Sequence, residues 1–232
     1  DARKNSYIFG RLCAKRALVQ CTNQVTQLDH LCITNGVFGQ PVVSQNPYPS
    51  AMGVSISHSH HVVAAIAFSQ SHPMALDVEV VDPTHTHTIW TQLTPHERQL
   101  LQVTNQTNAL GCTLLWSAWE SLAKGLQAGL SITHTPYEVK QLEVTNGITR
   151  VHFRHFSHVV AICFLLNSDT LAQNPLLTMN VQAMDKPSRC SHKRKLPCWL
   201  SVLVPKQNDN SHFLSALHTA CQQTKELFNA VD

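Results

Sequence analysis

The sequence predicts a mixed α+β fold, because stretches with a helical period alternate with short segments of strand character. One helical pattern covers residues 3–21, and a longer one covers about 110–127. Strand-like segments bounded by Gly, Pro and Asn fill much of the chain between and after these helices. At 232 residues the chain is long enough to bury a substantial core, in one large domain or two small ones.

Composition argues against several classes of protein. The formal net charge of +3 is too small and too dispersed to indicate a nucleic-acid-binding protein. No apolar run approaches the roughly 20 residues of a membrane span, and the start does not resemble a signal peptide. The eight cysteines are scattered without a Cys-x-x-Cys pair, which favours reduced thiols. We therefore expect a cytoplasmic protein with no membrane span and no nucleic-acid partner.

The first part of the chain combines a helix with two strands. Residues spaced to form a buried stripe on the first helix are Tyr7, Leu12, Ala14, Ala17 and Leu18. Residues 33–50 are rich in Gly, Pro and Asn and indicate turns with short extended pieces. Strand character follows at Val54–His58 and Val62–Ser69, and the polar segment Ser55–His61 is expected to form a loop at the end of a sheet.

Apolar and acidic residues alternate in Met74–Val81. With the strand period of two, Asp77 and Glu79 project from one face of a predicted strand. The apolar side chains on the opposite face are Leu76, Val78 and Val80. The sequence therefore predicts a strand with one acidic face.

Two helices are predicted next. Thr94 is the N-cap of the first, where Glu97 completes a capping box and Pro95 fits the first turn, and the helix ends near Val103. The second helix runs from about Leu110 to Gln127 and can be ended by Gly129. Its expected core stripe is Leu114, Leu115, Ala118, Leu122 and Leu126. Glu120 and Lys124 are four residues apart and share a face of this helix.

Three strands are predicted after this helix, at Tyr137–Val144, Ile148–Arg154 and His158–Leu166, and Asn146-Gly147 indicates a hairpin turn. Periodicity is lost beyond Asn167. We expect residues 168–232 to be an extension of the fold, with a basic run at 186–195, a short apolar piece at 199–204 and an amphipathic helix at 211–231.

The sequence contains fifteen histidines, some of which are grouped at positions 58, 60 and 61 and at positions 85 and 87. His85 and His87 would share one face of a strand, but no third nearby Cys or His follows a recognised metal-ligand spacing. A His-rich metal-binding protein therefore stays open as one alternative.

Asp77, Glu79, Glu120 and Lys124 would form a phosphate-chemistry site if the fold brought them together. Carboxylates that lie close repel one another unless a hard cation sits between them, and Mg²⁺ suits carboxylates plus substrate phosphates, with Mn²⁺ as a substitute. Each piece taken alone is typical of a solvated strand face or an ordinary helix ion pair. The prediction therefore depends on the rest of the chain.

Five motifs in order give the chain a resemblance to a known family. The motifs are Gly10-Arg11-x-x-Ala14, Gly39-x-Pro41, Ser55-Ile56-Ser57-His58-Ser59, Leu76-Asp77-Val78-Glu79 and Trp116-Ser117-x-x-Glu120-Ser121-x-x-Lys124. With these motifs the sequence resembles, over about residues 3–166, the large, single-chain 4′-phosphopantetheinyl transferases of the surfactin and enterobactin-synthesis type. These enzymes activate carrier proteins for fatty acid, polyketide, nonribosomal peptide and siderophore synthesis.

The resemblance implies a fold of two similar halves, each a small antiparallel sheet packed on a long helix. The halves would be residues 1–74, which bind the nucleotide of coenzyme A, and residues 75–167, which carry the metal site and the catalytic helix, with 168–232 as the extension. Because both halves lie in one chain, the site would be complete in a monomer.

The implied reaction is the Mg²⁺-dependent transfer of phosphopantetheine from coenzyme A to a serine of an apo acyl or peptidyl carrier protein. The second product is adenosine 3′,5′-bisphosphate. Asp77, Glu79 and Glu120 would hold the metal, with Glu120 as the base and Lys124 on the phosphates. The resemblance also assigns coenzyme A contacts, at Arg3, Arg11, Ser57 and His58.

Two positions depart from the family pattern. Gln40 and Trp119 stand where the family usually carries basic residues. Each loss of a charged hydrogen bond to phosphate would cost about 1.5–3 kcal/mol. On this interpretation Trp119→Lys raises activity or coenzyme A affinity. The alternative is a weak or inactive homologue that binds coenzyme A or a carrier protein without turnover.

Overall fold

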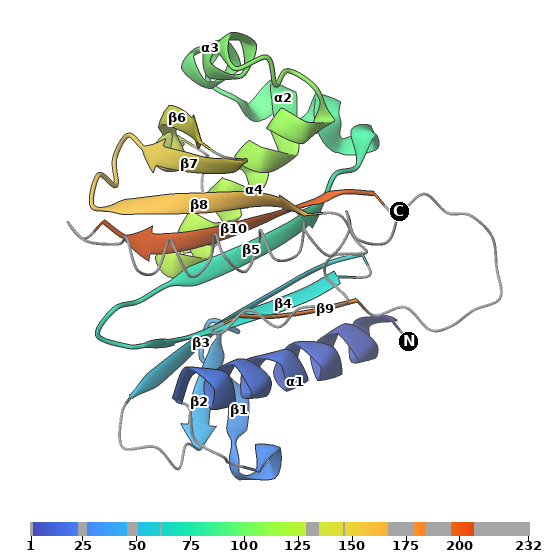
Figure 1. Ribbon diagram of the computed structural model, residues 1–232, viewed down its shortest axis with the longest axis vertical. Coiled ribbons are helices and arrows are strands. Elements are labelled where there is room, and N and C mark those ends of the chain that lie inside the picture. The colour runs from blue at the N-terminus through green and yellow to red at the C-terminus, as the bar shows by residue number, and fades with distance from the viewer. Residues whose placement is uncertain are drawn as a thin grey trace, which may run out of the picture.

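The computed structural model describes residues 2–22, 27–45, 51–60, 62–128, 135–145, 147–166, 179–183 and 196–206. Within these ranges two sheets share a common core, and a long helix packs on the other side of each (Figure 1). The first sheet contains, in spatial order, β3 (Met52–Ser59), β4 (Val62–Ser69) and β9 (Met179–Ala183). The second contains β5 (Ala75–Val80), β10 (Cys198–Pro205), β8 (Val159–Leu166), β7 (Ile148–Phe153) and β6 (Val139–Thr145). The predicted α+β class with antiparallel sheets is confirmed.

Helix α1 (Ala2–Thr22) covers the outer face of the first sheet. The residues that it buries there are Cys13, Ala14, Ala17 and Leu18. Most of these are small, so the helix can approach the strands closely. Tyr7, expected in the buried stripe, is instead 51 % exposed, and the guanidinium of Arg11 lies 4.4 Å from the centre of its ring.

Strand β4 is buried on both faces, as its unbroken apolar sequence predicts. Its alternate residues divide between two cores. Val62, Ala64 and Ile66 belong to the core between the two sheets. Val63, Ala65 and Ala67 pack against α1. This strand therefore joins the two cores.

The polar segment expected to be a loop is mostly strand. Ser55, Ser57 and Ser59 lie within β3, and the chain turns only at His60, whose φ of 52° is left-handed. The expectation failed because the serine side chains alternate with Val54, Ile56 and His58 and so satisfy the strand period.

A small hairpin lies beside the first sheet. After the short helix η1 (Leu28–His30), β1 (Cys32–Asn35) pairs with β2 (Pro41–Gln45), in agreement with the predicted turns and short extended pieces. Gly39, with φ of 79°, adopts the left-handed conformation that the turn requires. The backbone amide of Gly36 donates to the carbonyl oxygen of Gln40 at 2.7 Å, which closes the turn.

The two predicted helices of the second half are confirmed. Helix α3 (Pro95–Val103) begins with the expected capping box of Thr94 and Glu97. It follows η2 (Pro83–His85) and α2 (Thr86–Gln92). Helix α4 (Ala109–Gly125) is capped by Asn108 and packs on the second sheet. The expected stripe of α4 is buried except for Leu126, which is 41 % exposed just past the helix.

Residues 168–232 are not simply an extension of the fold. Strand β10 lies between β5 and β8 and pairs with both, while β9 pairs with β4 in the first sheet. The apolar sequence of β10 is buried on both faces, which is typical of a central strand. The basic run at 186–195 and the helix expected at 211–231 lie outside the described residues.

The three strands expected after α4 are confirmed as β6, β7 and β8, with η3 (Thr135–Tyr137) before them. Asn146 of the predicted hairpin turn and Gly129, the predicted helix stop, lie outside the described residues. In the part of the chain that the structure describes, each helix is too short or too polar to cross a bilayer.

Candidate active site

The acidic strand β5 lies at the edge of the second sheet and is amphipathic, as predicted. Its apolar residues Leu76, Val78 and Val80 enter the core between the sheets. Asp77 and Glu79 project from the opposite face, which packs against α4. Asp77 is only 1 % exposed, so its carboxylate needs partners inside the protein.

Asp77 forms a compact cluster with Lys124 and Ser57. The Nζ atom of Lys124 lies 2.6 Å from Oδ1 of Asp77 and donates to Oγ of Ser57 at 2.8 Å. The Ser57 hydroxyl in turn donates to the same Oδ1 atom at 2.8 Å. Oδ1 therefore accepts two hydrogen bonds, whereas the buried Oδ2 has no hydrogen-bond partner. These residues come from β3, β5 and α4, so the cluster joins the two sheets to the helix.

Two further carboxylates lie near this cluster. Ser59 donates to Oε2 of Glu79 at 2.8 Å. Burial, followed by the negative charges of Asp77 and Glu120, raises the pKa of Glu79 to about 7, against the opposing effects of Ser59 and Lys124. Burial and the charge of Asp77 also raise the pKa of Glu120. The site therefore holds more negative charge than Lys124 offsets.

The three predicted metal ligands approach one another without forming a ready-made metal centre. No group of three His, Cys, Asp or Glu side chains in the described ranges has an arrangement that could hold a metal ion. The residues nevertheless fit a hard cation chemically, because carboxylate oxygens suit Mg²⁺ and Oδ2 of Asp77 is buried without a donor. A cation held by Asp77 would require Glu79 or Glu120 to turn toward it.

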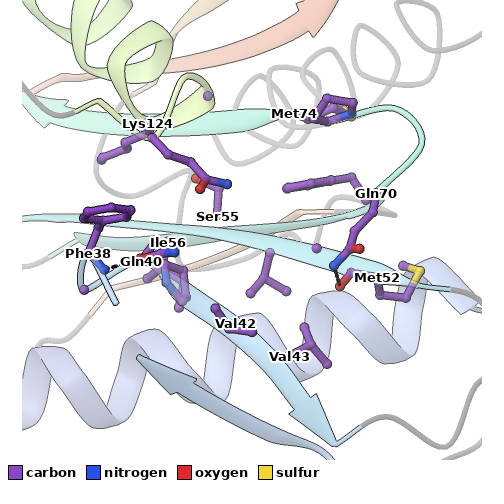
Figure 2. Close-up of a pocket in the computed structure, with 18 of the residues that line it drawn as sticks. Phe38, Gln40, Val42, Val43, Met52, Ser55, Ile56, Gln70, Met74 and Lys124 are labelled. Carbon is purple, nitrogen blue, oxygen red and sulfur yellow. Dashed lines mark hydrogen bonds between the residues drawn. The ribbon is translucent and has the colours of Figure 1, made fainter. Parts of the chain in front are cut away.

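A cavity of about 660 Å³ opens beside Lys124. Figure 2 shows Lys124, Phe38 and Gln40 toward one end and Met52, Gln70 and Met74 toward the other. Its walls come from the β1–β2 hairpin, β3, the segment before β5 and the end of α4. This volume lies in the range of small-molecule sites, and the lining combines apolar side chains with a comparable share of polar surface. The cavity therefore suits a small-molecule ligand with both apolar and polar parts.

Gln40 lines this cavity, but its side chain also supports the hairpin. Its Oε1 atom accepts a hydrogen bond of 2.9 Å from the backbone amide of Phe38. The amide side chain thus folds back over its own turn. A basic residue here could not make this contact, since lysine and arginine carry no acceptor.

The residues expected to contact coenzyme A occupy different places. Ser57 is 5 % exposed and engaged with Asp77 and Lys124, whereas His58 lies on the opposite face of β3 and is exposed. Arg11 on α1 donates to Asn35, beside the hairpin that lines the cavity. Arg3 lies in the first turn of α1, and its side chain is outside the described part. Their roles toward coenzyme A stay predictions.

Trp119 does not face the site. The side chain is fully buried in the core between α4 and the second sheet, and its indole N–H donates to Oε1 of Glu97 at 3.2 Å. The same Oε1 atom accepts the backbone amide of Val139 at 2.8 Å. The prediction that Trp119 replaces a phosphate-binding positive charge is therefore wrong, because this position belongs to the buried side of α4.

The paired histidines are also placed differently from the prediction. His85 ends η2 and His87 lies in α2, so the two are not on one strand face. Residues two apart on a helix do not share a face. Within the described residues, this pair therefore does not present two imidazoles on one strand face as a metal site would require.

Ser55 and Ser59 connect β3 to β5, a contact that the sequence interpretation missed. Their hydroxyls accept the backbone amides of Leu76 and Val80, each at 3.1 Å. The Ser-x-Ser-x-Ser pattern at residues 55–59 could have indicated a strand with three serines on one face.

Comparison with known proteins adds no assignment. Neither the models of protein families nor the curated proteins include a match to this chain. The arrangement of the residues themselves is therefore what indicates the function.

Proposed function

We propose that this protein is a Mg²⁺-dependent 4′-phosphopantetheinyl transferase, which moves the phosphopantetheine group of coenzyme A to a serine of an apo acyl or peptidyl carrier protein. The observation that carries the proposal is the cluster of Lys124, Ser57 and Asp77 at the junction of the two sheets, next to a large cavity. Asp77 and Lys124 belong to motifs that resemble this family and lie far apart in the sequence. Their direct contact supports the grouping.

The overall architecture also supports the proposal. Each sheet packs on one long helix, α1 or α4, and the cluster lies between the resulting halves. This arrangement supports the two-half organisation that the resemblance implies. Strands β9 and β10 complete the sheets, so we assign residues 179–183 and 198–205 to the halves.

In this proposal coenzyme A occupies the cavity. Lys124 lies in the cavity wall, and together with the bound Mg²⁺ it would offset the charge of the pyrophosphate oxygens. The apolar surface of Met52, Phe68 and Met74 would accommodate less polar parts of the ligand. In this proposal the cavity binds the ligand, and the neighbouring carboxylates serve the reaction.

The carboxylates provide two functions in the proposed reaction. Asp77, through Oδ2, together with Glu79 and Glu120 would hold Mg²⁺, which when bound would neutralise charge on the phosphate oxygens. Glu120 would accept the proton of the attacking serine as the general base. Lys124 would hold the transferred phosphate in place.

The atoms of this step balance. The serine oxygen of the carrier forms a bond to the phosphorus that bears pantetheine, and the bond from that phosphorus to the bridging oxygen breaks. The serine proton passes to the Glu120 carboxylate, and adenosine 3′,5′-bisphosphate leaves with the bridging oxygen.

Intact-mass spectrometry of an apo carrier protein, incubated with this protein, coenzyme A and Mg²⁺, tests the proposal. We expect a mass gain of one phosphopantetheine group that a chelator abolishes. Asp77→Asn and Lys124→Met should abolish or strongly slow the gain. Glu143→Gln, on β6 outside the cluster, should retain it. No gain with several acyl and peptidyl carriers would contradict the proposal.

A binding protein without turnover is the second candidate. Gln40 favours it, because this neutral residue stands in the cavity wall where the family usually has a positive charge. Calorimetry with coenzyme A separates the two candidates. Tight binding without any mass gain on the carriers would support the binding protein.

A further inference from the structure

The two sheets meet along a seam where strands β3 and β5 lie side by side without pairing in one sheet. Ser55 accepts the amide of Leu76, and Ser59 accepts the amide of Val80. Serine hydroxyls therefore satisfy backbone groups that an edge strand would otherwise leave unpaired. The residue numbers of the bonded pairs increase in the same direction along both strands, so β3 and β5 run parallel.

Ser57 lies between these serines on the same face of β3 but has different partners. Its hydroxyl contacts two side chains, donating to Oδ1 of Asp77 and accepting from Nζ of Lys124. Lys124 also contacts that Oδ1 atom directly, at 2.6 Å. Both donors therefore converge on one oxygen of the carboxylate, and the buried Oδ2 is left without one.

We propose that Ser57 is a positioning residue for a divalent cation at Asp77, an inference that rests on the metal site of the proposed function. Together with Lys124, Ser57 fixes the carboxylate so that Oδ2 is the oxygen available to the cation. A carboxylate rotates easily about its Cβ–Cγ bond, so a single donor would orient it less firmly. Hydrogen bonds that orient metal-binding carboxylates typically change metal affinity by about 10–100-fold.

Ser55 provides a matched control for this inference. It lies two residues from Ser57 on the same strand face, is buried to a similar extent, and also bonds to β5. Its partner is a backbone amide and not the carboxylate. Removal of either hydroxyl should weaken the seam, but only removal of the Ser57 hydroxyl should alter cation binding.

The test measures Mn²⁺ binding by electron paramagnetic resonance of the full chain, without coenzyme A or carrier protein. Asp77→Asn defines the component that depends on Asp77, since fifteen histidines give background binding. We expect Ser57→Ala to raise the Kd of this component by about 10–100-fold. Ser55→Ala should leave it within about twofold, and Ser57→Thr, which keeps a hydroxyl, should restore most of the affinity. Thermal unfolding of each variant shows whether it is folded.

Each outcome bears on the inference separately from the transfer reaction. An unchanged Kd in a folded Ser57→Ala protein overturns the inference, even if the wild-type protein modifies a carrier. An equal loss in Ser55→Ala also overturns it, since the seam as a whole would then be responsible. Selective loss in Ser57→Ala supports the inference even if no carrier is modified. If the wild-type protein has no Asp77-dependent Mn²⁺ binding, both the inference and the metal site fail.

Discussion

Replacing Trp119 with lysine tests the orientation of helix α4, and thereby the placement of the candidate site. The indole is fully buried in the core between α4 and the second sheet, donates to Glu97, and lies 6.4 Å from the ring of Trp116 in a T-shaped arrangement. Removing a buried aromatic side chain of this size typically costs about 3–5 kcal/mol. Lysine would also bring a charge into the core, so we expect a loss at the upper end of this range or beyond.

Urea unfolding followed by circular dichroism measures this loss. For a chain of this length, 1 kcal/mol corresponds to roughly 2–4 °C in Tm, so a loss of about 5 kcal/mol should lower the melting temperature by roughly 10–20 °C. Trp119→Phe keeps an aromatic ring but removes the hydrogen bond to Glu97. We expect this control to lose only about 1–3 kcal/mol, since it leaves the carboxylate short of one donor.

The opposite expectation follows from reading Trp119 as a substitute for a phosphate-binding lysine. In that case Trp119→Lys would keep its stability and gain affinity for coenzyme A. A variant with wild-type stability and tighter coenzyme A binding would refute the burial argument and would place this face of α4 at the ligand.

Three other predictions concern pH, packing and thiol reactivity. Burial raises the pKa of Glu79 from 4.5 to about 7, so between these pH values the folded state binds more protons than the unfolded state. The free energy of unfolding should therefore fall as the pH rises from 4.5 to about 7. Thermal unfolding in the presence of a chelator should show a smaller fall for Glu79→Gln. Gly111→Ala should destabilise α4 despite the better helix propensity of alanine, because the new Cβ would meet the backbone oxygen of Gln106. In Gly125→Ala the new Cβ would come close only to a side chain, so urea unfolding should show a smaller loss of stability for this variant. Cys163 is fully buried, and burial raises the pKa of its thiol to about 12. Iodoacetamide at pH 8 should therefore leave this cysteine unlabelled in the folded protein and label it in urea, which peptide mass spectrometry can measure.

Local patterns in the sequence were sufficient to predict several elements. The alternation of Asp77 and Glu79 with apolar residues identified β5 and both of its faces. The Thr94 and Glu97 spacing identified the start of α3, because a capping box is satisfied within one turn of chain. In each case the deciding interactions lie within a few residues, so the sequence carries them directly.

The orientation of Trp119 was also encoded locally, although the interpretation missed it. Leu115, Trp119 and Leu122 have the i, i+4, i+7 spacing of one helix face, and the structure buries all three. The motif resemblance gave this position a role in phosphate binding, and the helical period was the more reliable guide.

The place of β10 could not be read from local patterns. An apolar segment of eight residues fits a central strand, an edge strand or a buried helix equally well. Its position is decided by pairing with β5 and β8, which precede it by more than a hundred residues and by about thirty residues. Such pairings depend on the whole fold. The sequence beyond Asn167 also lacks the periodicity that would have placed β10 relative to the earlier strands.

The position of β10 explains why Asp77 can remain buried at the site. In the register of the second sheet, Asp77 pairs with Ser201, which pairs with Cys163, which pairs with Thr149. All four side chains are at most 2 % exposed and lie on the face toward α4. This row consists of small side chains, whereas the next row in one direction carries the bulky Trp199. Asp77 ends the row at the edge strand, where Ser57 and Lys124 reach it, so the site depends on the late strand β10 as much as on the acidic motif.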